Sequence, residues 1–301
     1  MGEIELRDLY GGHIYHVCTN GTDCPVLMRC DEDYQSALNY LPIVAWRTSV
    51  QIAAYSIMSN HFHFLILCET RVQAQNFIKR FKQLISTYLS KKYDLKCPMK
   101  GIADSITLID DMNYMRTCIA YMLRNPVCAR LCRTIDGYPW SSYACYFRRN
   151  NSIASNVILS EMSARERRRL LKIDRGLAGC PFRIDEMGVI IPQSFVRYDI
   201  VESAFGNSGK SFLYYLGHCN DSQMEYELAV KPQMRTADTE LVCQVETLCQ
   251  KYFPGKTLAQ LTISNKTSMV KKLYYSNKTS IPQLSRVLGV PRSLILTILS
   301  A

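Results

Sequence analysis

Two histidines that flank one bulky apolar residue constrain the fold of this chain most strongly. The triplet His61-Phe62-His63 opens an apolar run that continues through Phe64 to Leu67. Side chains two residues apart on a β-strand point to one face, so both imidazoles would emerge together while Phe62 enters the opposite, buried layer. Two neutral imidazoles can form part of a divalent-metal site, but a pair of strand histidines that only hydrogen-bond fits the triplet equally well.

A tyrosine on a downstream helix is the candidate chemical partner. Residues 110–125 show helical spacing of apolar side chains, begin with two aspartates suited to a helix N-terminus, and are expected to end before Pro126. Tyr121 and Asn125 are four residues apart, so they share one face of this helix. A phenol nucleophile beside a His, His, amide-oxygen metal site suits phosphodiester transesterification. Each residue also has an ordinary structural explanation, because 19 tyrosines are present and asparagine is common at helix ends.

Four stretches in the first half of the chain support the catalytic interpretation. They are SIMSNHFHFLI at 56–66, YMLRNPVCARL at 121–131, GYPWSSY at 137–143 and GHIYHV at 12–17. In their order along the chain they resemble the motifs of the HUH single-tyrosine transposases, which include REP-associated tyrosine transposases and insertion-sequence transposases. The resemblance covers roughly residues 8–147. The second and third stretches favour a transposase over the related replication initiators and relaxases.

The resemblance implies a role for four residues. His61 and His63 correspond to metal ligands, Tyr121 to the nucleophile, and Asn125 to the third ligand of a site for Mg²⁺ or Mn²⁺. It further implies a transposase that cleaves and rejoins single-stranded DNA, including hairpin DNA, through a 5′-phosphotyrosine intermediate. A non-catalytic DNA-binding regulator remains the alternative of a different class. We expect the other histidines to be structural; His13 and His16 fall on opposite strand faces and so do not predict a joint metal site.

The element order predicts an α+β fold in which an antiparallel sheet carries helices on one face, of the ferredoxin-like or RRM-like HUH nuclease type. Strands are expected at 13–19, 50–58, 62–67 and 102–109, and helices at 33–46, 71–92 and 110–125. Three domains are predicted: a catalytic domain at 1–150, a basic connecting region of unknown fold at 151–235, and a helical DNA-binding domain at 236–301.

Charge and cysteine usage indicate the surroundings of the chain. It has 36 basic and 26 acidic residues, a net charge of +10, which suggests an anionic partner. The 13 cysteines contain no Cys-x-x-Cys pair, so reduced thiols are expected rather than disulfides or zinc. The sequence contains neither an export signal nor a run of 18 apolar residues, so we expect a cytoplasmic, nucleoid-associated protein without a membrane partner. Whether it is a monomer or a homodimer is left open.

Two basic surfaces are candidates for DNA contact. One face of helix 71–92 carries Lys79, Arg80 and Lys82; such a face is usually only solvated, but beside a phosphate-handling site it favours nucleic acid. The last 51 residues hold eight Lys or Arg and no acid, which suits a phosphate-facing surface.

Within that tail, residues 281–295 predict a helix-turn-helix. Gly289 can end the first helix in a left-handed conformation, and the following proline can begin the second. Arg286, Arg292 and Ser293 are then candidates for contact with duplex DNA. An ordinary helical hairpin is the alternative interpretation.

Overall fold

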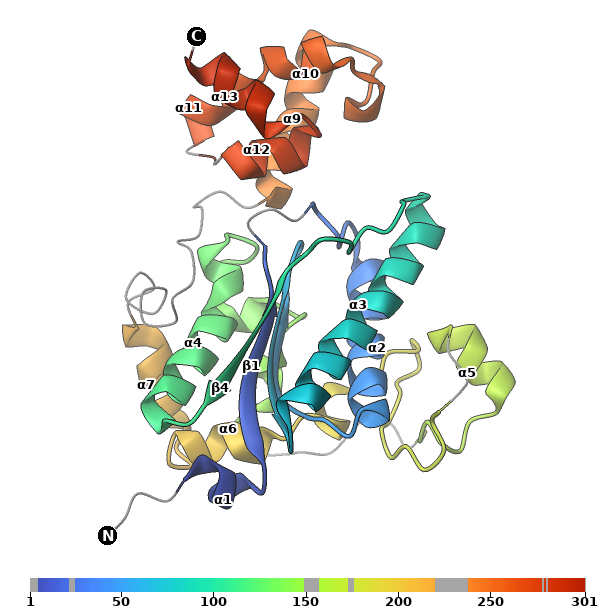
Figure 1. Cartoon of the computed structure of the whole chain (residues 1–301), viewed down its shortest axis with the longest axis vertical. Coiled ribbons are helices and arrows are strands. Elements are labelled where there is room, and N and C mark those ends of the chain that lie inside the picture. Colours follow the sequence, from blue (N-terminus) through green and yellow to red (C-terminus); the bar gives the residue numbers. More distant parts are fainter. Residues whose placement is uncertain are drawn as a thin grey trace.

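The structure is a computed structural model that describes residues 5–21, 25–148, 157–172, 176–219, 238–277, 279 and 281–300. Figure 1 shows a larger body built around a sheet and a smaller, helical body formed by the C-terminal residues. The helices of the described residues are all too short or too polar to cross a lipid bilayer.

Four strands form one antiparallel sheet in the order β2-β3-β1-β4. They are β1 (His13–Thr19), β2 (Gln51–Ile57), β3 (Phe62–Cys68) and β4 (Asp104–Ile109). The predicted strands are confirmed to within two residues at each end. Cys18 on β1 lies opposite His63 on β3 and opposite Ser105 on β4, which fixes the register next to the histidine triplet.

Helices cover both faces of this sheet, so the α+β class is confirmed but the expectation of helices on one face is wrong (Figure 1). Phe62 and Phe64 meet Phe81 of α3 (Arg71–Tyr93) edge to face, with ring centroids 5.1 and 5.0 Å apart. His63, between them in sequence, faces α4 (Met112–Cys128), where it contacts Tyr121. All seven residues of β3 are buried, and a strand that is buried on both sides needs a layer on each.

Helix α4 runs through Pro126 instead of ending before it. The backbone N–H of Ala129 donates to the carbonyl of Asn125 at 2.9 Å, so the helical ladder continues past the proline. Proline lacks an N–H and removes one donor from the ladder, a loss that a final helical turn tolerates. As a result Asn125 stays helical, and its side chain keeps the four-residue phase with Tyr121.

The remaining elements of the larger body pack around the sheet. The described part of 151–235 contributes Ile200, Val201, Phe212 and Leu216 to the same core as the sheet. The side chain of Ser163 caps one of these helices by accepting from the N–H of Glu166. These elements are α1 (Leu6–Tyr10), α2 (Asp31–Arg47), α5 (Ala164–Leu171), α6 (Tyr198–Ala204) and α7 (Gly209–His218), with 3₁₀ turns Ile135–Gly137, Ser142–Cys145 and Pro192–Ser194.

The C-terminal body has a separate hydrophobic core. The two short helices expected around Gly289 are present, and Gly289 joins them with a φ of 65°. A helix-turn-helix and a helical hairpin share this arrangement, so the helix-turn-helix stays a prediction. Val290 is buried in the turn between them. The helices of this body are α9 (Asp238–Tyr252), α10 (Ile263–Ser268), α11 (Val270–Asn277), α12 (Ile281–Leu288) and α13 (Arg292–Ser300), with a 3₁₀ turn at Leu258–Gln260.

Candidate active site

Strand β3 and helix α4 bring the four residues of the predicted catalytic site together. Nε2 of His63 lies 2.9 Å from Nδ2 of Asn125. The ring of Tyr121 stands edge-on to His63, with centroids 5.4 Å apart and planes at 90°. The ring of His61 lies 4.9 Å from that of His63. Two imidazoles, an amide and a phenol therefore form one cluster on a single face of the sheet.

His61 is oriented by the residue that precedes it. Asn60 Nδ2 donates to the carbonyl oxygen of Gly21 at 2.7 Å, which turns the amide oxygen toward His61. This oxygen accepts from Nδ1 of His61, also at 2.7 Å. A carbonyl can only accept, so His61 carries its proton on Nδ1 and offers the lone pair of Nε2 to a metal. Sequence reasoning quoted Asn60 as part of the motif but assigned it no role.

Gly21 packs directly against the His61 ring. A Cβ atom added at Gly21 would lie 2.6 Å from His61 Nδ1, a distance that real Cβ contacts do not show. Only glycine therefore leaves room for the imidazole in this orientation. The loop after β1 is in this way part of the site.

His16 is a further member of the cluster that sequence reasoning treated as structural. Its Nε2 lies 3.2 Å from Nδ1 of His63, and the two rings stack with an interplanar angle of 12°. His13 lies on the other face of β1, beside Tyr15, so the two histidines do point apart as predicted. The pairing register of β1 with β3 was the missing information, because it makes His16 a diagonal neighbour of His63.

Burial keeps the three histidines of the cluster neutral. Desolvation lowers the pKa of His16 to about 4. It also lowers the pKa of His61 to about 4, with a smaller contribution from the charge of Arg286. The pKa of His63 falls well below its ordinary value, first through desolvation and then through the two neighbouring histidines. Near neutral pH each imidazole consequently offers a lone pair, as metal ligation requires.

These donors fit a divalent ion. Asn125 places its amide within hydrogen-bond distance of the His63 nitrogen that faces α4, and a half-turn of the amide about its last bond would present the oxygen instead. The tautomer of His61 is fixed by Asn60. Two imidazole nitrogens and one amide oxygen form a set that Mn²⁺ accepts readily and that Mg²⁺, which prefers oxygen, accepts less well.

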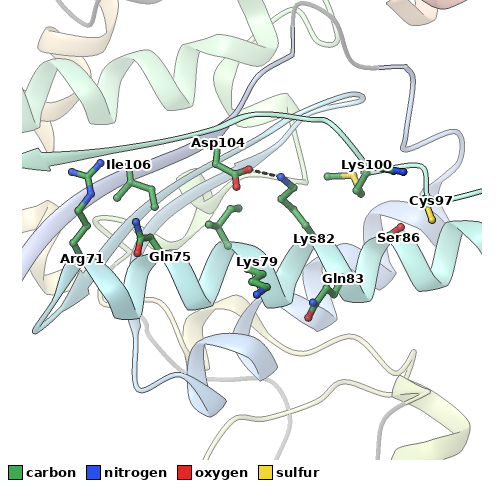
Figure 2. A pocket seen from close by; sticks show the side chains of 12 residues that line it. Arg71, Gln75, Lys79, Lys82, Gln83, Ser86, Cys97, Lys100, Asp104 and Ile106 are labelled. Atoms are coloured by element: carbon green, nitrogen blue, oxygen red, sulfur yellow. Dashed lines mark hydrogen bonds and ion pairs between the residues drawn. The ribbon is translucent and has the colours of Figure 1, made fainter.

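The basic residues of α3 that were predicted to contact DNA do not all share one surface. Lys79 and Lys82 line a groove of about 600 Å³ between α3 and the edge strand β4 (Figure 2). Lys82 is held there by Asp104 at 2.7 Å. Arg80 is exposed on α3 and does not line this groove. Sequence reasoning missed the other cations of the lining, Arg71 and Lys100. Arg71 is the first residue of the helix, and Lys100 lies outside the helix whose charges were considered.

The C-terminal candidates differ in their surroundings. Arg286 forms an ion pair with Asp238 at 2.6 Å, with both side chains largely buried. Its Nη1 also lies 3.4 Å from the carbonyl oxygen of Gly21, which places the C-terminal body next to the loop against His61. Arg292 and Ser293 are exposed at the start of α13.

Comparison with known proteins finds a family match for the segment that carries the histidine triplet. Residues 26–101 match the family model described as "Transposase IS200 like". A solved structure of a REP-associated tyrosine transposase bound to a REP hairpin is similar at 18% identity with a TM-score of 0.34, over 48% of this chain and 84% of that chain. No curated protein matches significantly. The matched segment contains the histidine triplet with strands β2 and β3, so in residues 26–101 this chain is similar to the IS200-like transposases.

Proposed function

We propose that this protein is a metal-dependent transposase that cleaves and rejoins single-stranded DNA through a 5′-phosphotyrosine intermediate. The observation that carries the proposal is the meeting of Tyr121 and Asn125 with the histidine pair, from elements far apart in the sequence. The family match over 26–101 supports it from the sequence side, although Tyr121 and Asn125 lie beyond the matched residues.

Tyr121 is the proposed nucleophile. Its phenolic oxygen attacks the phosphorus, a bond from phosphorus to that oxygen forms, and the bond to the 3′-oxygen of the preceding nucleotide breaks. The phenol loses its proton, and the departing oxygen gains one to become a 3′-hydroxyl. One phosphodiester replaces another, so attack of a different 3′-hydroxyl on the phosphotyrosine joins new ends without ATP.

His61, His63 and the amide oxygen of Asn125 would hold Mg²⁺ or Mn²⁺, and the bound ion would draw charge from a non-bridging oxygen of the phosphate. The neighbouring side chains prepare these ligands. Asn60 keeps the proton of His61 on Nδ1, and His16 accepts from Nδ1 of His63, so that both imidazoles keep the lone pair on Nε2. Burial of Tyr121, His63 and His16 shields the phenol and these two imidazoles from water.

The groove between α3 and β4 is the proposed path of the single strand. Ile78, Met99 and Ile106 supply an apolar lining on which a base can rest. The cations around them suit phosphates, and Asp104, the acid of the lining, is paired with Lys82 (Figure 2). The first residues of β4 lie two strands from His63, roughly 10 Å across the sheet. A strand of DNA leaving the groove over this edge would reach the tyrosine.

A second role in duplex binding is proposed for the C-terminal body. Arg292 and Ser293 stand exposed at the N-terminal end of α13, where a helix-turn-helix contacts DNA. A protein that bound duplex DNA through these residues and cleaved no strand would instead be a regulator.

A covalent adduct is the direct test of the catalytic proposal. Full-length protein would be mixed with Mn²⁺ and a pool of labelled single strands that carry a short hairpin beside random sequence. The proposal expects a band that survives denaturation, disappears on chelation, and is lost in Tyr121→Phe. Tyr114→Phe, on the same helix and half-buried, is the matched control and should keep the band. An adduct that persisted in Tyr121→Phe would refute the assignment.

A further inference from the structure

Three metal-ligating side chains meet on the side of His63 away from Asn125. His16 and Cys18 from β1 and His63 from β3 each offer one ligand atom, and these atoms all lie within 4.8 Å of one another. Cys18 pairs directly with His63 across the two strands, and His16 follows on the same face. The thiol of Cys18 has no part in the transesterification proposed above.

We propose that His16, Cys18 and His63 form a second metal site, which binds a soft divalent cation such as Zn²⁺ and switches the nuclease off. Two imidazole nitrogens and one thiolate match the ligand preference of zinc, with water in the fourth tetrahedral position. Magnesium takes oxygen ligands and would not enter such a site. Binding stands on this donor set alone, whereas the inhibitory effect rests on the proposed function.

The spacing of the donors fits a tetrahedral ion. Nε2 of His16 and Nδ1 of His63 are 3.2 Å apart. Bonds of about 2.05 Å at a tetrahedral angle separate two nitrogens by about 3.3 Å, so the imidazoles already stand at the required distance. Bonds of about 2.3 and 2.05 Å separate a sulfur from a nitrogen by about 3.5 Å, so the sulfur of Cys18 has to approach by at most about 1.3 Å, which a rotation of its side chain can supply.

The protonation states are compatible with metal uptake. Burial raises the pKa of the Cys18 thiol to about 11, so the thiol is protonated before an ion arrives. Zinc would displace that proton to solvent and form the Zn–S bond, with no change in oxidation state. His16 is neutral and needs no proton removed from the nitrogen that binds.

Inhibition follows because the neutral imidazole of His63 has one lone pair for a metal, on either Nδ1 or Nε2. The catalytic arrangement needs the lone pair of His63 on Nε2, which puts the proton on Nδ1. Zinc on Nδ1 takes the lone pair there and leaves the proton on Nε2, where it faces Asn125 instead of a metal. One ion therefore excludes the other at His63.

Cobalt provides a spectroscopic test of binding that requires no activity. Co²⁺ would be titrated into metal-free, full-length protein, and the thiolate-to-cobalt absorption in the near ultraviolet recorded together with the visible bands of a tetrahedral ion. We expect one equivalent to give this signal in the wild type and in Cys68→Ser, and Cys18→Ser to lose it. Cys68 is the matched control because it is buried in the same sheet and its sulfur contacts the carbonyl of Thr70, which serine can also do. Competition with Zn²⁺ should bleach the signal.

A thiolate signal that was unchanged in Cys18→Ser would overturn the site. Should circular dichroism show that Cys18→Ser is unfolded, Cys18→Ala provides the same comparison, and His16→Ala should lose the signal independently.

For the inhibitory effect, the concentration of Zn²⁺ that halves adduct formation should be at least about tenfold higher for Cys18→Ser than for Cys68→Ser, each relative to its own zinc-free rate. Cobalt binding without inhibition by zinc would overturn the switch, whereas absence of any adduct would count against the proposed function instead.

Discussion

The side chains of the candidate active site are kept neutral, whereas those of the basic groove keep their positive charge. In the active site His16 and His63 are buried and His61 is partly buried, and desolvation keeps all three neutral. In the groove Lys79 is exposed to solvent, and Lys82 is partly covered and paired with Asp104. Metal ligation needs lone pairs, which burial protects, whereas capture of a polyanion needs positive charge that water and phosphate can both reach. Variants in the two regions should consequently fail in different ways.

Loss of His63 should have the largest effect. His63→Ala removes a metal ligand that also contacts Asn125 and Tyr121, so we expect adduct formation to fall by at least about 100-fold and Mn²⁺ binding to be lost. Single-strand binding at low salt should stay close to that of the wild type. His218→Ala, at the exposed end of α7, is the control and should change neither. Equal loss of adduct and of DNA binding would contradict the division between the two regions.

Loss of Asn60 should have the second-largest effect, because Asn60 acts on the metal only through His61. Asn60→Ala removes the acceptor that holds the proton on Nδ1 of His61, and we expect Mn²⁺ affinity, measured by calorimetry, to weaken by about 10- to 100-fold. Asn60→Asp keeps an acceptor for His61 but loses the N–H that donates to Gly21, so it should recover part of the affinity. An Asp variant no better than the Ala variant would argue that Asn60 only shapes the loop.

A methyl group at Gly21 should disturb the same imidazole by contact. Gly21→Ala places a carbon 2.6 Å from the present position of His61 Nδ1, so the ring or the loop has to move. We expect about a tenfold loss of adduct formation with the thermal midpoint little changed, since the loop lies outside the sheet. Gly217→Ala, where an added carbon meets open space on α7, is the control. Full activity in Gly21→Ala would show that His61 does not need this orientation.

Substitutions in the groove should have the smallest effect of the four, and this effect on DNA binding should depend on the salt concentration. Lys79→Ala combined with Lys100→Ala should reduce the slope of log K against log salt for single-stranded DNA by about 0.7 for each phosphate contact removed. The rate of adduct formation at saturating DNA should change little. Arg80→Ala, on α3 outside the groove, is the comparison and should change the slope less. Equal slopes for all three proteins would exclude the groove as the path of the strand.

Local patterns sufficed to predict much of the site. The two-residue period placed Phe62 in one layer and His63 in the other, and the four-residue period placed Tyr121 above Asn125. Pro126 misled the prediction of the helix end, because a helix can lose one donor in its last turn.

What the sequence could not provide was the pairing between strands. His16 joins the site only through the register of β1 with β3, and Gly21 only through the path of the loop that follows β1. Lys100 likewise joins Lys79 in the groove only because the chain folds back along α3. These contacts join residues far apart in sequence, so the periodicity within a single helix or strand cannot predict them.

Mapping the protein side of the covalent adduct tests the central claim most directly. Cleavage after Arg116 and Arg124 yields the peptide TCIAYMLR, in which Tyr121 is the single tyrosine. After adduct formation and nuclease trimming, mass spectrometry should find a nucleotide phosphate on this peptide and leave the unmodified peptide depleted. A nucleotide phosphate on any other tyrosine-containing peptide, with TCIAYMLR unmodified, would contradict the account.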